Sequence, residues 1–97
     1  MASSKHGAQP RWAKREIRIV NESGLHARPA AEFVRIANSF RAEIWLVKGE
    51  ERFSATSIVE VLTADLSRGD TAVIEADGAD AEQAVAHLVK LIQSFND

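Results

Sequence analysis

The chain has 97 residues, enough for one small domain with a single hydrophobic core. Its hydrophobic share of 45% excludes an intrinsically disordered protein, and the absence of cysteine excludes disulfides and thiolate chemistry. No apolar run is long enough to cross a membrane or to form a secretory signal, and a reducing cytoplasm fits this composition.

The net charge of −2 is unevenly distributed along the chain. The first 15 residues carry four basic side chains and no acidic one, so the remainder must carry −6. An acidic domain disfavours nucleic acid as its partner. We therefore divide the chain into a flexible basic extension, residues 1–14, and a folded domain, residues 15–97. A docking arm built on Trp12 and its basic neighbours is the alternative for the extension.

Hydrophobic periodicity predicts the elements of the first half of the domain. Residues 16–20 alternate as a strand does. Apolar residues three and four positions apart then predict a helix that reaches about Phe40 and turns one face to a core. Two further strands are expected at residues 42–47 and 52–55, on either side of a short polar turn.

Two capping signals mark the starts of two later helices. Ser57 and Glu60 have the spacing of a capping box, in which the serine hydroxyl accepts from the Glu60 N–H and the glutamate reaches back. Asp80 and Gln83 give a second signal of the same kind.

The remaining boundaries complete the order of elements. The first of these helices should reach about Leu66, a strand should follow at residues 71–76, and the last helix should cover residues 81–95. The order is β-α-β-β-α-β-α, with one apolar stripe per helix and alternating strands. This pattern favours an α+β fold of two layers, an antiparallel sheet with three helices on one face.

The stretch Gly24-Leu25-His26-Ala27-Arg28-Pro29-Ala30 joins the first strand to the first helix. Gly24 can adopt the positive φ of a tight turn, and Pro29 suits a first helical turn. His26 should then lie at or beside the N-cap, where free N–H groups and the helix dipole favour an anion. The same field disfavours the imidazolium, so we expect a neutral, nucleophilic His26 near pH 7. Arg28 adds a guanidinium that can hold phosphate oxygens.

This motif resembles the active-site signature of the histidine-containing phosphocarrier family, HPr and NPr, of the bacterial phosphotransferase system. The resemblance extends from about Arg15 to Phe95. It implies an open-faced β-sandwich with a four-stranded sheet in the order 1-4-2-3. It also implies that Nδ1 of His26 accepts a phosphoryl group from an enzyme I-type donor and passes it to enzyme IIA-type acceptors. The relay would serve sugar uptake or a related nitrogen or regulatory branch, and Arg28 would stabilise the transferring oxygens.

The resemblance further implies a stoichiometric carrier rather than an enzyme. No cofactor and no metal are expected, and a monomer that does not insert into membranes is the default. His6 and His87 should be uninvolved, because neither has a partner at metal-ligand spacing. The sequence contains no glycine-rich phosphate loop with lysine, so the phosphoryl donor should be another protein rather than a nucleotide.

A second matching segment begins at Ser57. The resemblance places Ser57 on a serine that a kinase modifies in many relatives, but a cap alone is the alternative, because Glu60 would oppose a phosphate there. Three apolar residues match a patch on which partner proteins dock, unless they pack inside the domain: Ile58, Val59 and Leu62.

A regulatory module that binds partners through the Ser57 helix, without phosphoryl relay, is the alternative function. A module that had given up transfer would be expected to lose the histidine. This chain has both His26 and Arg28, so the sequence favours the relay.

Overall fold

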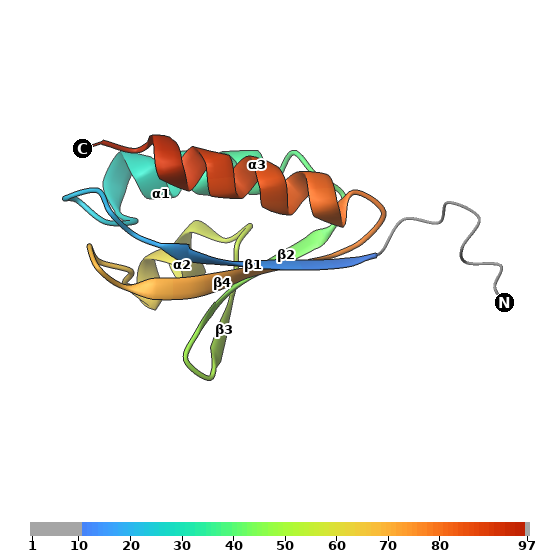
Figure 1. Ribbon diagram of the computed structural model, residues 1–97, viewed down its shortest axis with the longest axis horizontal. Helices are drawn as coiled ribbons and strands as arrows, with labels where there is room; N and C mark the ends of the chain where they lie inside the picture. Colours follow the sequence, from blue (N-terminus) through green and yellow to red (C-terminus); the bar gives the residue numbers. More distant parts are fainter. Residues whose placement is uncertain (1–10, 97) are drawn as a thin grey trace, which may run out of the picture.

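The elements follow one another in the predicted order in the computed structural model, which describes residues 11–96. They are β1 (Trp12–Arg18), α1 (Ala27–Ala37), β2 (Glu43–Lys48), β3 (Glu51–Ser54), α2 (Ile58–Ala64), β4 (Thr71–Asp77) and α3 (Ala81–Ser94). The helices cover one face of the sheet, and Figure 1 shows α1 and α3 on this side. Within the described range, no helix combines the length and hydrophobicity needed to cross a membrane.

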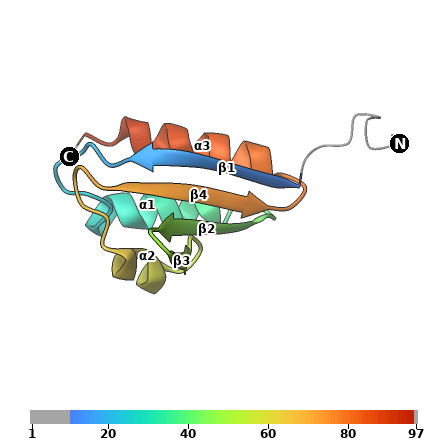
Figure 2. The same ribbon diagram turned by 60° about the horizontal axis from the view of Figure 1, so that its bottom comes forward.

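The four strands form one antiparallel sheet in the order β1-β4-β2-β3, which confirms the order 1-4-2-3. Figure 2 shows β4 between β1 and β2. In the register, Ile17 lies opposite Ala72, and Leu46 lies opposite Ile74. All four are buried, because alternate side chains of each strand point toward the helices. The outer strands are β1 and β3.

The core lies between the sheet and the helices. In α1, Ala30, Phe33 and Ala37 are buried at the spacing that the sequence predicts. The longer α3 buries six residues along one side: Ala81, Ala84, Val85, Leu88, Val89 and Ile92. Every buried side-chain nitrogen or oxygen of the described residues has a hydrogen-bond partner, as a well-formed interior requires.

The first strand begins earlier than the alternation predicts. Trp12 to Arg15 pair with residues 74–77 of β4, so β1 starts four residues before residue 16. Of the predicted extension, Trp12 to Lys14 therefore belong to the sheet, and residues 1–10 lie outside the described residues. The indole of Trp12 lies 6.5 Å, centroid to centroid, from that of Trp45.

All three helices end earlier than predicted: α3 by one residue, at Ser94, and α1 and α2 by more, for local reasons. α1 stops at Ala37 rather than Phe40, because Asn38 caps it: its side-chain amide donates to Val34 O at 2.9 Å and to Thr56 O at 3.2 Å. α2 stops at Ala64 rather than Leu66, because Asp65 adopts a left-handed conformation with φ +52° and ψ +55°.

The two capping predictions have different outcomes. Ser57 is the N-cap of α2, and its Oγ accepts from Glu60 N at 3.2 Å, as predicted. The Glu60 carboxylate, however, accepts from Ser54 N at 2.7 Å rather than from Ser57 N.

The predicted side-chain cap at Asp80 was wrong. Asp80 precedes α3, but its side chain makes no cap hydrogen bond. Its carboxylate instead accepts from Arg41 N at 2.9 Å and from Ala42 N at 2.8 Å, because the chain that enters β2 passes beside it. These hydrogen bonds, chiefly the one from Arg41, hold the pKa of the Asp80 carboxyl below its ordinary value of 3.8.

Candidate functional site

His26 is the N-cap residue of α1, where the sequence predicts it. Its backbone is extended, with φ −131° and ψ 169°, and its side chain makes no cap hydrogen bond. The side chain is 35% exposed. The imidazole therefore lies at the amide end of the helix and remains accessible from solvent, a position that suits the binding of an anionic group.

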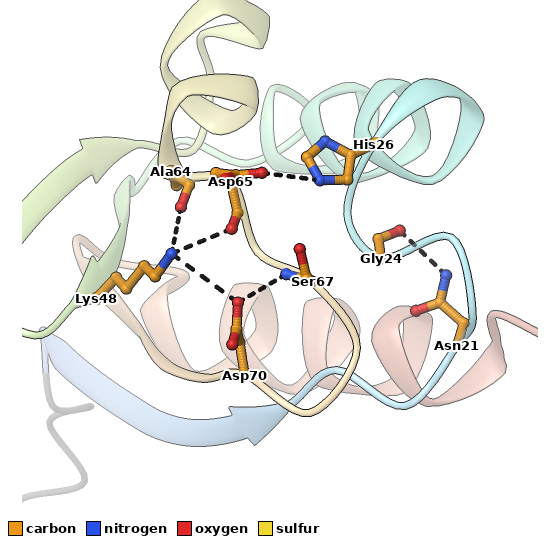
Figure 3. Close-up of polar contacts among 8 residues, drawn as sticks. All are labelled: Asn21, Gly24, His26, Lys48, Ala64, Asp65, Ser67 and Asp70. Carbon is orange, nitrogen blue, oxygen red and sulfur yellow. Dashed lines mark hydrogen bonds and ion pairs between the residues drawn. The ribbon is translucent and has the colours of Figure 1, made fainter.

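The turn before His26 is held by Gly24 and Asn21. Gly24 has φ +71°, and its carbonyl accepts from the buried Asn21 side chain at 3.1 Å (Figure 3). A Cβ on Gly24 would lie only 2.6 Å from the carbonyl oxygen of Leu66. The same oxygen accepts from Leu25 N at 2.8 Å. The loop that carries His26 is thus fixed against the segment that follows α2.

Asp65, which the sequence analysis did not select, contacts the ring of His26. Its Oδ1 lies 3.3 Å from Nε2, and its side chain is 74% exposed. Figure 3 shows this contact as a dashed line. A carboxylate can only accept, so this contact favours a proton on Nε2, which in a neutral ring leaves the lone pair on Nδ1. Figure 3 shows Nδ1 directed away from Asp65.

Lys48 of β2 fixes the end of α2 from which Asp65 projects. Its ammonium donates to the carbonyls of Ala64 at 2.9 Å and Asp65 at 3.1 Å. It also lies 3.9 Å from the carboxylate of Asp70, which accepts from Ser67 N at 2.8 Å. A cation on the last carbonyls of a helix is electrostatically favourable. Figure 3 shows these contacts beside the His26–Asp65 pair.

Ala27, the first residue of α1, has φ +50°. A left-handed conformation costs a residue with a Cβ roughly 1–2 kcal/mol. Strain of this kind persists only where the surrounding structure imposes it. Here the left-handed conformation of Ala27 turns the chain from the extended backbone of His26 into the rest of helix α1.

Arg28 is exposed and occupies the second position of α1. It lines a surface groove beside the C-terminal end of α3, formed with Leu91, Ser94 and Phe95 among others. Its side chain makes no ion pair or hydrogen bond with any residue in the range 11–96. No other described group therefore holds the guanidinium, which is close in sequence to His26.

The three apolar residues of the second matching segment are exposed on α2. The exposed fractions are 40% for Ile58, 69% for Val59 and 41% for Leu62, whereas Val61 between them is buried. They do not pack inside the domain, which was the alternative. Asp65 caps the C-terminal end of the same helix, so the α2 patch (Ile58, Val59 and Leu62) is continuous with the element that contacts His26.

Among the described residues, His87 is the only other histidine, and it is not part of this site. His87 lies on α3, where its ring packs 5.6 Å from that of Phe40, centroid to centroid. His6 lies outside the described residues. Across residues 11–96, no three histidine or acidic side chains converge as metal ligands.

A family model described as the PTS HPr component phosphorylation site matches residues 13–94. The chain belongs to the HPr family. Phosphocarrier protein HPr of Haemophilus influenzae is 44% identical over 81 residues, which are 84% of this chain and 95% of the relative. Phosphocarrier protein NPr of Shewanella violacea is 35% identical over 84 residues, 87% of this chain and 92% of the relative.

Solved structures agree with this assignment. The crystal structure of HPr-C-His from Thermoanaerobacter tengcongensis matches with a TM-score of 0.83 and 40% identity, over 84% of this chain and 92% of that one. The resemblance to HPr and NPr and the open-faced fold are thus confirmed. HPr-family proteins of the phosphotransferase system are phosphocarriers, not catalysts, so this chain is a carrier rather than an enzyme.

Proposed function

We propose that His26 accepts a phosphoryl group on Nδ1 from an enzyme I-type protein and passes it to enzyme IIA-type acceptor domains. The observation that carries this proposal is the placement of the ring. His26 is half-exposed at the N-cap of α1, and Asp65 faces Nε2, so Nδ1 is the nitrogen with a lone pair for attack.

The helix supports the phosphoryl group electrostatically. The first amides of a helix have no intrahelical partner, and its dipole places positive potential at this end. A phosphoryl group carried by the N-cap residue can be stabilised by both effects. Phosphoryl transfer depends mainly on positioning and charge stabilisation, which this arrangement can supply without a metal ligand set.

Arg28 would contribute to the transfer step itself. Its guanidinium has no partner among residues 11–96 that it would need to leave. A planar fork of N–H donors suits phosphate oxygens. We infer that it contacts the transferring group when a partner protein is bound.

The α2 patch would serve as the docking surface for donor and acceptors. Exposed apolar side chains that cluster on one short helix are typical of a protein–protein contact. The patch belongs to the helix whose end contacts His26, so a partner bound there would have the imidazole within its reach.

Sugar uptake and the nitrogen or regulatory branch would use this site in the same way. Relatives with both the HPr and the NPr name are similar to this chain. Because phosphoenolpyruvate, the source of the phosphoryl group in such a relay, is a metabolite of the cell interior, we place the carrier in the cytoplasm.

Regulation at Ser57 is a separate hypothesis. The Ser57 hydroxyl accepts from Glu60 N, and the Glu60 carboxylate lies in the same helical turn. A phosphate on Ser57 would gain from the helix N-terminus and lose by repulsion from Glu60. Kinase modification of Ser57 stays a prediction, as does a regulatory module without relay.

Labelling of two histidine variants tests the relay. Full-length wild type, His26→Ala and His87→Ala are incubated with phosphoenolpyruvate and a purified enzyme I-type protein of each branch. Acid-labile label is expected on wild type and on His87→Ala, the matched control, and should be lost in His26→Ala. Undiminished label on His26→Ala would contradict the proposal, and the faster donor would identify the branch.

A further inference from the structure

Asp65 is fixed at the one ring nitrogen of His26 that the proposed relay does not use. Its Oδ1 lies 3.3 Å from Nε2. Its backbone is left-handed, with φ +52°, a conformation that aspartate and asparagine tolerate better than most residues with a Cβ.

The position of this carboxylate is set by backbone contacts on two sides. Asp65 N donates to Leu62 O at 3.1 Å, which closes the last turn of α2. Asp65 O accepts from the ammonium of Lys48 at 3.1 Å, and the same ammonium binds Ala64 O at 2.9 Å. Figure 3 shows Lys48 on the side of Asp65 away from the ring. The carboxylate is thus presented to His26 from a segment tied to β2.

We infer that Asp65 is a positioning residue that reserves Nε2 of His26 and directs the phosphoryl group to Nδ1. This inference rests on the proposed function of His26. With the proton held on Nε2, only Nδ1 has a lone pair for attack on phosphorus. The negative carboxylate also repels an anionic phosphoryl group from Nε2. The proton on Nε2 and the charge of Asp65 therefore both favour phosphorylation at Nδ1.

The transfer step balances with the proton left in place. The Nδ1 lone pair forms the bond to phosphorus while the donor's bond to phosphorus breaks and its electron pair returns to the donor. The ring then carries a positive charge, with its proton on Nε2 facing Asp65. An aspartate that orients a histidine and stabilises its imidazolium has the same task in the Ser-His-Asp triad. Onward transfer reverses these bond changes.

The isomer of phosphohistidine is the direct test. Phosphoramidate, a small-molecule phosphoryl donor, is reacted with the full chain, and the Nδ1 and Nε2 products are separated by phosphorus and nitrogen NMR. Asp65→Gly removes the carboxylate and suits the left-handed backbone. Because the Asp65 side chain is 74% exposed, we expect the share of the Nε2 isomer to rise about fivefold, the size of effect typical of one solvent-exposed hydrogen bond.

Two further variants separate the effect on the ring from a change in charge or fold. Asp65→Asn keeps an oxygen acceptor and tolerates the left-handed conformation, so it should retain the Nδ1 product. Asp77→Asn makes the same chemical change at the far end of β4 and should behave as wild type. An isomer ratio in Asp65→Gly equal to that of wild type overturns the inference.

A measurement on the unphosphorylated protein distinguishes failure of the inference about Asp65 from failure of the proposed relay. The ¹⁵N shifts of the His26 ring report which nitrogen carries the proton, and Asp65→Gly is expected to raise the Nδ1–H form. An unchanged tautomer population contradicts the role of Asp65 even if the protein relays phosphate. Conversely, a wild type that phosphoenolpyruvate-driven donors never label refutes the relay, whatever the ring nitrogens show.

Discussion

Gly24 lies too close to the segment after α2 to carry a side chain. A Cβ there would stand 2.6 Å from Leu66 O and 3.1 Å from the Cα of Ser67. Both are backbone atoms, so Gly24→Ala must displace the main chain rather than a flexible side chain. The displaced oxygen is also the acceptor of the Leu25 N–H, at 2.8 Å.

The expected loss of stability has two parts. Alanine at φ +71° costs about 1–2 kcal/mol, because its Cβ is strained in the left-handed region. Weakening the buried hydrogen bond to Leu66 O adds about 1–3 kcal/mol. Gly24→Ala should therefore lower the free energy of unfolding by about 2–5 kcal/mol, a large share of the stability of a small domain.

Gly49→Ala is the matched control for this variant. Gly49 has φ +61°, close to that of Gly24, but a Cβ there would meet no atom within 4 Å. Only the conformational cost of about 1–2 kcal/mol applies. Equilibrium urea unfolding, followed by tryptophan fluorescence, measures both losses. Equal losses for the two variants would show that the close approach to Leu66 is not what requires glycine, and would refute this reasoning.

Three other changes probe docking, transfer and acid stability. Val59→Glu, on the exposed α2 patch, should slow phosphoryl transfer from a protein donor but not from phosphoramidate; equal slowing of both would exclude a docking role. Arg28→Ala should slow transfer about tenfold with the fold intact, and Arg28→Lys should recover part of the rate; unchanged transfer rates in Arg28→Ala would remove it from the mechanism. Asp80→Ala should cost about 1–3 kcal/mol near pH 7, since two backbone N–H groups lose their acceptor. Because the native pKa of Asp80 lies below 3.8, this contribution is present above that pH and is lost as the pH falls through the native pKa. In urea unfolding, the difference in the free energy of unfolding between wild type and Asp80→Ala should decrease as the pH is lowered. A difference that does not change with pH would contradict the role of the carboxylate.

The fold could be predicted from the sequence because each element has one buried side. Strands with one solvated face alternate, as Ile17 and Ile19 do in the first strand region, and both are buried. The start of β1 was missed because Arg15 shares the parity of Ile17 yet is exposed. On an edge strand an inward-facing position can reach solvent, so a charge there interrupts the pattern without ending the strand.

In the candidate site, the features that depend on residues close in sequence could be predicted, and those that depend on distant residues could not. The N-cap position of His26 follows from neighbours within one short motif, and the structure has it there. The contact with Asp65 depends on where α2 ends and on a left-handed aspartate, neither of which has a periodic signal. The Asp80 carboxylate was misassigned for a related reason: its partners, Arg41 and Ala42, lie in a segment brought beside it only by the tertiary fold.

The strand order dictates when a growing polypeptide can complete its sheet. β4 is the only strand among residues 11–96 that pairs with β1, and it also pairs with β2. During synthesis β1 emerges from the ribosome before the other strands. It has no strand to pair with until the whole of β4, which ends at Asp77, has also emerged. The turn that carries His26 likewise cannot form its hydrogen bond to the carbonyl of Leu66 until that residue has been synthesised. The sheet therefore closes only through pairing of the first and last described strands, and a topology with such long-range contacts is expected to fold slowly.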